Sequence, residues 1–352
     1  MKVAVLLSGG VDSSVALRLL KEEGHDLTAF YLKIWLQDEF SFLGDCPWED
    51  DLLFARQVCE QAGVPLEVLP LQTEYWDTVV SYTIAEIKAG RTPNPDIFCN
   101  KLIKFGQFYD KIDTSFEKVA SGHYANVVFE ADKYHLKKSP DPVKDQTYFL
   151  AYLTQQQLSR ASFPIGKYNK KQIRELAQKY DLANKKRKDS QGICFLGQIK
   201  FNEFVKYHLG IKTGEIIEID SGKVMGEHNG YYYYTIGQRS GLGLSGGPWY
   251  VVKKDHINNK IYISKSNEVL FKEKDEFFVS NFNWICEEPP STNELQVKIR
   301  HGEHYYNCNL NMIDDSKWKV KIDKHDRGIA PGQFAVFYNG EYCLGAAVIV
   351  DG

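Results

Sequence analysis

Hydrophobic positions in the first third of the chain alternate between short continuous runs and helical spacing. An apolar run at residues 3–7 precedes a segment in which Val15 and Leu19 share one helical face. The alternation then continues, with strands expected at 27–34, 65–71 and 118–121 and helices expected at 50–62 and 75–89. It predicts an α/β fold with a parallel sheet covered by helices on both faces. Ligands of such sheets bind beyond the carboxyl ends of the strands.

The pattern changes twice further along the chain. In residues 145–210 the apolar positions mostly recur at helical spacing, for example at 170–180 and 201–209. From residue 211, short alternating runs separated by Gly, Asn and Asp predict strands at 214–219, 231–236, 249–252, 260–264, 296–300, 318–322, 334–338 and 346–350. We therefore expect a Rossmann-like domain with a helical extension at 1–210, a central β-rich domain at 211–270 and a β-barrel-like domain at 271–352.

Composition narrows the class of protein without identifying a reaction. The 352 residues carry a formal net charge of −3, are 43% hydrophobic and include 7 cysteines without a short-range paired pattern. No apolar run approaches a membrane span, and Met1 leads straight into the first strand. We expect a cytoplasmic protein with reduced thiols and no membrane partner. The charge argues against non-specific coating of nucleic acid but leaves room for a local basic patch.

The turn after the first strand carries the clearest chemical signal. Residues 8–14 read Ser-Gly-Gly-Val-Asp-Ser-Ser. Two glycines allow close approach of the backbone to a ligand, and hydroxyls together with N–H groups at a helix start can donate to phosphate oxygens. Asp12 could hold Mg²⁺ beside the phosphates, and no other metal site is predicted. The alternative is an ordinary turn with a capped helix, which the glycine pair and the hydroxyl cluster disfavour.

Two cysteines stand in segments suited to thiol chemistry. Cys99 follows the stiff stretch Thr92-Pro93-Asn94-Pro95 near the start of a helical pattern, where the helix dipole favours thiolate, and Asp96 is a candidate general base or orienting group. Cys194 lies between glycines just after the cation run 185–188, which can neutralise phosphates and lower a thiol pKa. Alternatively, Cys99 could simply be a small buried side chain, and Cys194 could be an ordinary residue of a loop that follows a lysine-rich helix end.

Seven ordered segments make the chain resemble a known family. The loop at 8–14 resembles the pyrophosphate loop of ATP pyrophosphatases, which adenylate a substrate oxygen. Together with six further segments it is similar to the bacterial tRNA-specific 2-thiouridylase family over the whole chain. The six segments are residues 92–106, 120–125, 144–150, 189–195, 234–243 and 330–338.

The resemblance implies a tRNA-uridine 2-sulfurtransferase. ATP would adenylate the C2 oxygen of a flipped wobble uridine, because a stacked base is unreachable. A persulfide on Cys194 would supply sulfur, and Cys99 would end in a disulfide with Cys194, with Asp96 as the third catalytic residue. The ATP site carried over by the resemblance comprises Leu6, Leu7, Ser8, Gly9, Gly10, Val11, Asp12, Ser13, Leu32 and Gly122.

The resemblance also implies partners and their contacts. The substrate would be a tRNA of the Lys, Glu or Gln type, and a cysteine desulfurase or sulfur-relay protein would donate sulfur. Arg300-His301 departs from the usual Arg-Tyr pair, and Leu32 replaces a common methionine. The tRNA and target-base contacts carried over are Asn94, Pro95, Asp96, His123, Lys144, Asp145, Gln146, Arg300, His301 and Gln333.

Several alternatives stay open at this point. A nitrogen-adding ATP pyrophosphatase would need a glutaminase domain or an amino-acid pocket, and a simple binding module would not need paired thiols. Asp96, Cys99 and Cys194 could instead hold an iron–sulfur cluster, although cluster cysteines are usually closer in sequence. The tyrosines at 231–234 could stack on bases, but we expect a strand with one buried face. The acids at 45–51 are interpreted as a helix start, and the other five cysteines as packing residues.

Overall fold

The computed structural model describes residues 1–34, 48–188, 201–265, 274–326 and 328–351. Its N-terminal part is built on a parallel sheet in the order β3-β2-β1-β4-β7. The strands are β1 (Lys2–Leu6), β2 (Asp26–Lys33), β3 (Leu66–Pro70), β4 (Lys118–Ala120) and β7 (Ala161–Ser162). The expected parallel sheet is confirmed.

Helices cover both faces of this sheet because β1 is apolar on both sides. Val3 and Val5 pack with helices α1 (Val11–Glu22) and α3 (Trp48–Ala62). Ala4 and Leu6, which point to the other face, pack in a core that includes Phe105. Buried parallel strands are continuous hydrophobic runs for this reason, because successive side chains enter two different cores.

Two long helical segments contain π-helical stretches. The first runs through α4 (Gln72–Tyr75), η2 (Trp76–Val80) and α5 (Ser81–Lys88). The second runs through α6 (Pro95–Phe98), η3 (Cys99–Gln107) and α7 (Phe108–Lys111). Pro95 at the first turn lacks the N–H that would be unpaired there. Shorter helices follow at α8 (Thr147–Leu150), α9 (Gln155–Arg160), α10 (Lys170–Lys179) and α11 (Phe201–Leu209).

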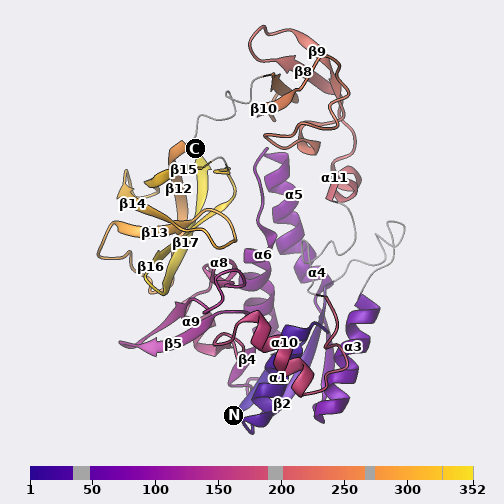
Figure 1. Cartoon of the computed structure of the whole chain (residues 1–352), viewed down its shortest axis with the longest axis vertical. Coiled ribbons are helices and arrows are strands. Elements are labelled where there is room, and N and C mark those ends of the chain that lie inside the picture. The colour runs from indigo at the N-terminus through magenta and orange to yellow at the C-terminus, as the bar shows by residue number, and fades with distance from the viewer. Residues whose placement is uncertain (35–47, 189–200, 266–273, 327, 352) are drawn as a thin grey trace.

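The β-rich parts form two further bodies (Figure 1). The smaller sheet has the order β10-β11-β8-β9 and lies beyond the end of α5. Its strands are β8 (Gly214–Glu218), β9 (Val224–His228), β10 (Tyr250–Asp255) and β11 (Lys260–Ser264). The larger body is a barrel of β12 (Lys274–Trp284), β13 (Glu294–Lys298), β14 (Tyr306–Met312), β15 (Lys317–Asp326), β16 (Phe334–Asn339) and β17 (Tyr342–Asp351). Pairing of β12 with both β15 and β17 closes it.

One hairpin joins the N-terminal part to the barrel sheet. Strands β5 (Asn126–Glu130) and β6 (Lys133–Lys137) pair with each other, and β6 also pairs with the start of β17. The register brings Lys137 opposite Tyr342, and the Tyr342 hydroxyl donates to Glu130. The expected boundaries near residues 210 and 270 stay a prediction. The larger sheet nevertheless combines β5 and β6 of the N-terminal part with the strands of the barrel.

The strand expected at 231–236 is wrong. Tyr231–Tyr233 form a 3-10 turn, η4, after Gly230 at a φ of +142°. The Tyr231 hydroxyl donates to the carbonyl of Lys88 at the end of α5, and the Tyr233 hydroxyl donates to Gly210 at 2.6 Å. Long-range hydrogen bonds thus override the local alternation, and these tyrosines attach the small sheet to the helices below it.

The helices among the described ranges are also short or polar. None of them combines the length and the apolar character that crossing a lipid bilayer requires.

Candidate functional site

The loop between β1 and α1 has the features of a phosphate-binding turn. Gly9 adopts a φ of +72°, and a side chain there would meet the carbonyl oxygen of Asp51 at 2.2 Å. Ser13 and Ser14 donate their hydroxyls to the carbonyl of Gly10 at 3.1 and 2.8 Å. These bonds fix the turn from inside, and the first N–H groups of α1 have no carbonyl of their own helix to bind.

A second loop lies against this helix start. Gly122 follows β4, and a Cβ on it would come within 2.6 Å of the backbone nitrogen of Ser13. The Tyr124 hydroxyl donates to Asp12 at 2.9 Å, and the Lys170 ammonium reaches both oxygens of Asp12 at 2.7 and 2.9 Å. The two loops expected at the carboxyl edge of the sheet therefore meet. The half-exposed Asp12 carboxylate beside a helix N-terminus is the kind of donor that Mg²⁺ takes, and it would be the residue to hold it.

The apolar residues of the expected ATP site lie in the hydrophobic cores beside the sheet and not at the surface. Leu6, Leu7 and Val11 are buried, with Leu6 at the end of β1 and Val11 at the start of α1. Leu32 is partly buried near the end of β2 and packs against two of the core clusters. These apolar side chains belong to the cores that support the loop, whereas the groups that can donate hydrogen bonds come from residues 8–14.

The segment that carries Asn94, Pro95 and Asp96 is held from the barrel side. The Gln333 amide donates to the carbonyls of Thr92 and Pro93 at 3.1 and 3.2 Å. The backbone N–H of Thr92 donates to Pro331 at 2.9 Å. Asn94 donates its N–H to the hydroxyl of Tyr82, whose pKa burial raises to about 12. Gln333, expected to touch tRNA, thus positions the proposed base-binding segment.

Cys99 is enclosed in this conformation. It is 1% exposed, at the start of the second turn of the helix that begins at Pro95. Its hydrophobic cluster includes Phe204 and Val205 of α11. Reaction of this thiol with sulfur from outside therefore requires the covering side chains to move. Cys194, its expected partner, lies outside the described residues.

Asp145 in the expected tRNA-binding segment 144–146 is buried. Its carboxylate accepts from the N–H of Ser139 at 3.0 Å and from the hydroxyl of Thr147 at 2.7 Å. The ammonium of Lys298 on β13 lies 3.5 Å away, and both charged side chains are almost fully enclosed. Gln146 exchanges hydrogen bonds with the backbone of Tyr124. The side chains of Asp145 and Gln146 are therefore used within the protein, so a role of either in tRNA binding would be indirect.

Arg300 and His301 have different surroundings. Arg300 forms a two-pronged pair with Asp326 at 2.8 and 2.5 Å, and its side chain is half exposed. His301 stacks on Phe149 with ring centroids 4.7 Å apart. Burial lowers the pKa of His301. The ring is therefore neutral near pH 7, and Phe149 already occupies one of its faces.

His123 lies next to the Gly122 contact. Its Nδ1 is 2.7 Å from the Ser121 hydroxyl, and its ring packs edge-on against Phe163. Burial, with a smaller contribution from Lys104, lowers the pKa of His123 well below 6.5. The ring is therefore neutral near pH 7, so a contact with RNA would be a hydrogen bond or a stack rather than an ion pair.

The other described cysteines and the acids at the start of α3 have surroundings that fit packing and helix-dipole roles, while Asp45 and Cys46 lie outside the described residues. Cys59, Cys308 and Cys343 are buried, and burial raises the pKa of the Cys59 and Cys308 thiols to about 12. Glu49, Asp50 and Asp51 occupy the first turn of α3, where acids favour the helix dipole. Among the residues with described positions, no group of three or more His, Cys, Asp or Glu side chains is arranged to hold a metal ion.

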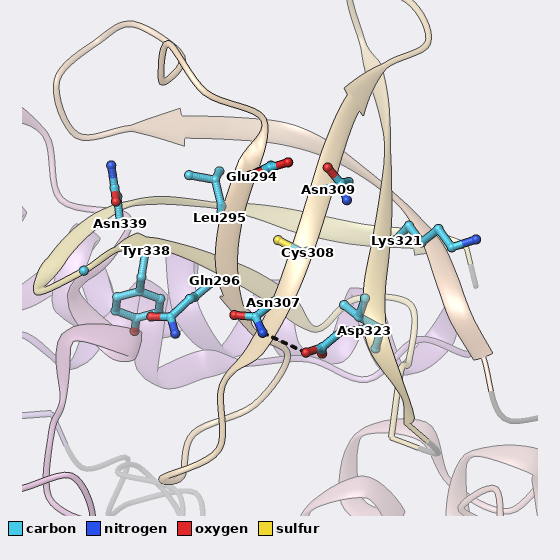
Figure 2. A pocket seen from close by; sticks show the side chains of 12 residues that line it. Glu294, Leu295, Gln296, Asn307, Cys308, Asn309, Lys321, Asp323, Tyr338 and Asn339 are labelled. Carbon is cyan, nitrogen blue, oxygen red and sulfur yellow. Dashed lines mark hydrogen bonds between the residues drawn. The ribbon is translucent and has the colours of Figure 1, made fainter.

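A cavity of about 420 Å³ with a mixed polar and apolar lining lies on the barrel (Figure 2). Strands β13, β14, β15 and β16 line it, and Asn307 donates to Asp323 across it at 2.8 Å. It contains none of the residues expected to bind ATP or tRNA.

Sequence reasoning missed three residues around the phosphate loop. Lys170 binds Asp12, while Asn184 and Arg187 both donate to the carbonyl of Gly9, at 2.8 and 3.1 Å. Arg187 belongs to the cation run, but residue type alone did not show that it faces the loop. The only available signal was the Asn cap before Lys170, which marks a helix start without indicating its neighbour.

Comparison with known proteins covers the chain from end to end. Three family profiles match in order. They are described as a tRNA methyl transferase HUP domain (residues 1–198), a tRNA methyl transferase PRC-barrel domain (202–265) and an aminomethyltransferase beta-barrel domain (274–349).

Solved structures give weaker matches. A U34-tRNA thiolase NcsA from Methanococcus maripaludis, solved with its 4Fe-4S cluster, has a TM-score of 0.36 and 19% identity over 60% of this chain and 68% of that one. An NMN synthetase from Francisella tularensis has a TM-score of 0.31 and 18% identity over 57% and 71%.

Curated relatives match at much higher identity. A tRNA-specific 2-thiouridylase MnmA of Parabacteroides distasonis is 44% identical, with 100% of this chain and 99% of that protein aligned. Proteins described in the same way from Bacteroides fragilis and Porphyromonas gingivalis are 45% and 42% identical, over 99% and 100% of this chain and 100% of each relative. The chain therefore belongs to the tRNA-specific 2-thiouridylase MnmA family.

Proposed function

We propose that this chain is an ATP-dependent sulfurtransferase that converts the wobble uridine of tRNA into 2-thiouridine. The observation that carries the proposal is full-length identity of 42–45% to relatives described as tRNA-specific 2-thiouridylases. The profile descriptions mention methyl transfer. Thiolation is favoured over it because residues 8–14 present hydroxyls and helix N–H groups suited to a polyphosphate.

The first step is activation of the base by ATP. The loop at 8–14 binds the polyphosphate, and the C2 oxygen of the uridine attacks the α-phosphorus, so that pyrophosphate leaves. Asp12 would hold a Mg²⁺ ion that neutralises charge on the phosphates. Asn94, Pro95 and Asp96 receive the flipped base, at a segment that Gln333 holds in place.

The second step replaces oxygen by sulfur. The terminal sulfur of a Cys194 persulfide attacks C2, and AMP leaves with the original oxygen. The Cys99 thiolate then attacks the Sγ of Cys194, which breaks the S–S bond, releases the thiolated base and leaves a Cys99–Cys194 disulfide. A persulfide-carrying protein supplies the sulfur, and a cellular thiol reduces the disulfide for the next cycle. Since tRNA is a cytoplasmic substrate, we expect the enzyme to act there.

Purified protein tests the proposal directly. The wild-type enzyme, ATP, Mg²⁺ and a persulfide donor are combined with a tRNA of the Lys type, and its nucleosides are measured by mass spectrometry. A tRNA with cytidine at the wobble position is the control. We expect 2-thiouridine only with wobble uridine, together with one pyrophosphate per thiolation. Pyrophosphate release without any thiolated nucleoside under reducing and persulfide-loaded conditions would contradict the function.

Substitution of the proposed sulfur carrier separates the two steps. We expect Cys194→Ser to retain tRNA-dependent pyrophosphate release and to lose sulfur transfer by at least ~10³-fold, because the proposed adenylation step uses the loop at 8–14 and the segment 94–96 and needs no thiol. Cys286→Ser, at a half-buried cysteine on the barrel side, is the matched control and keeps both activities. Loss of tRNA binding by Cys194→Ser would instead mean that this cysteine has a structural role.

A further inference from the structure

The carbonyl of Gly9 is bound by two side chains from outside the phosphate loop. The Asn184 amide donates to this oxygen at 2.8 Å and to the Ser14 hydroxyl at 2.8 Å. The Arg187 guanidinium donates to the same oxygen at 3.1 Å. Asn184 is 1% exposed, so its amide is fixed in place. Both donors converge on one peptide of the loop.

The chain segment that carries these donors is itself held rigidly. The Arg187 N–H donates to the carbonyl of Asn184 at 2.8 Å, which closes a turn. Arg174 of α10 donates to the carbonyls of Lys185 and Arg187 at 3.3 and 2.7 Å. The turn thus presents two side chains to Gly9 from a fixed position.

A third element completes the enclosure of Gly9. Asp51, in the first turn of α3, forms an ion pair with Arg187. Burial raises the pKa of Asp51, although its hydrogen bond and charge interaction with Arg187 act in the opposite direction. The carbonyl of Asp51 lies so close that only glycine fits at position 9. The loop, α3 and the 184–187 turn therefore meet around a single peptide.

The orientation of this peptide determines what the loop shows to a ligand. In a trans peptide the C=O and the following N–H point in opposite directions. Donors bound to the Gly9 carbonyl therefore direct the N–H of Gly10 to the other side of the peptide. If the peptide turned over, its carbonyl oxygen would take that place and would repel phosphate. Glycine on both sides makes such a turn inexpensive unless something prevents it.

We propose that Asn184 and Arg187 are positioning residues that keep the Gly9–Gly10 peptide oriented to bind the polyphosphate of ATP. The inference rests on the proposed function and assigns a role in it to two residues outside the loop. Their effect reaches the nucleotide through the backbone of Gly9, so neither residue needs to touch the phosphates.

Four variants of the full-length protein test this role. Asn184→Asp keeps the shape but replaces the donor by an oxygen facing the Gly9 carbonyl. Arg187→Met removes the charge and the donors, while Arg187→Lys keeps the charge. Lys171→Met removes one positive charge from an 87% exposed side chain on α10 and is the control. ATP and tRNA affinities are measured by calorimetry, and KM and kcat for ATP by pyrophosphate release.

We expect Arg187→Met and Asn184→Asp to weaken ATP binding about ten- to a hundredfold, with KM changing more than kcat. Arg187→Lys should recover part of the affinity. The melting temperature of Arg187→Met should fall somewhat, because Asp51 loses its partner, while tRNA affinity stays close to wild type. A simple folding role would weaken the binding of ATP and tRNA in parallel. If Asn184→Asp does not fold, the two Arg187 variants still decide.

Three outcomes would overturn the inference. The first is unchanged ATP affinity in a folded Arg187→Met protein. The second is an equal loss in Lys171→Met, which would indicate a long-range charge effect. The third is a loss of tRNA affinity alone in Arg187→Met. Failure of the wild-type protein to bind ATP would contradict the proposed function itself, which separates the two failures.

Discussion

At the scale of single residues, Lys170 and Tyr124 both bind the Asp12 carboxylate. Both oxygens of Asp12 accept from the Lys170 ammonium, and one also accepts from the Tyr124 hydroxyl. The negative charge beside the phosphate loop is thereby neutralised. Without Lys170, this carboxylate would face the polyphosphate of ATP with its charge uncompensated.

We expect Lys170→Met to raise the KM for ATP about tenfold, through repulsion between Asp12 and the phosphates. Lys170→Arg, which keeps the charge, should lose much less. The double variant Asp12→Asn/Lys170→Met should recover affinity for ATP in calorimetry without Mg²⁺ if repulsion is the cause, and omitting Mg²⁺ keeps the proposed metal role of Asp12 out of the comparison. Equal losses in the single and double variants would mean that Lys170 itself binds the nucleotide.

His123 gives the stability of the protein a dependence on pH. Its folded-state pKa lies well below the unfolded value near 6.5, so the unfolded chain binds the proton more readily. The stability contributed by the neutral ring is present above pH 6.5 and is lost as the pH falls towards the folded pKa.

We expect the urea-unfolding free energy to fall between pH 7 and 5, by up to about 1.4 kcal/mol per pH unit for this histidine. His208, His228 and His301 have pKa values lowered in the same direction. The contribution of His123 is therefore read from the difference between wild type and His123→Asn. Parallel pH profiles of the two proteins would refute it.

At the scale of elements, the site depends on one close approach between two loops. The loop after β4 contacts the first turn of α1 at Gly122, where even a methyl group would meet backbone atoms. We expect Gly122→Ala to push these loops apart and to weaken ATP binding at least tenfold, with a lower melting temperature. Gly24→Ala is the control for loss of a glycine elsewhere, because it faces open space, and its backbone strain at a φ of +79° leaves these two loops in place.

Much of this element pattern follows from the sequence, for a physical reason. Strands such as 2–6 are buried on both faces, and a continuous apolar run encodes that burial locally. The 3-10 turn at Tyr231–Tyr233 was missed because its hydroxyl partners, such as Lys88, are far away in sequence. The burial of Asp145 was missed for the same reason, since Lys298 completes its site. Sequence motifs thus predict which residues lie near the site, whereas the orientation and burial of each side chain depend on partners far away in sequence.

At the scale of the whole molecule, the N-terminal part and the barrel share a buried ion pair and a sheet. The Asp145–Lys298 pair lies between them, and the Lys298 ammonium also lies 4.2 Å from the centre of the Tyr305 ring. Gln333 adds hydrogen bonds to the proposed base-binding segment. We infer that the barrel orients the residues proposed to contact tRNA instead of acting as a separate module.

We expect Lys298→Met to destabilise the protein by about 3–5 kcal/mol, because it leaves the Asp145 carboxylate buried without its partner. The double variant Asp145→Asn/Lys298→Met should recover part of that loss in urea unfolding. Lys319→Met, which breaks a surface pair with Glu276, is the control and should leave the midpoint nearly unchanged. A small effect of Lys298→Met would show that the two parts are held together by other contacts.

Strand β6 is synthesised long before β17, the strand with which it pairs. Its hairpin contacts Tyr342 on β17, and Glu130 and Tyr342 are 212 positions apart. At about 5–20 residues per second, the ribosome needs roughly 10–40 s to deliver that partner strand. During this interval the edge of β6 is an open template for pairing with other nascent chains. Chaperone dependence and aggregation should therefore peak in nascent chains that end between the hairpin and β17.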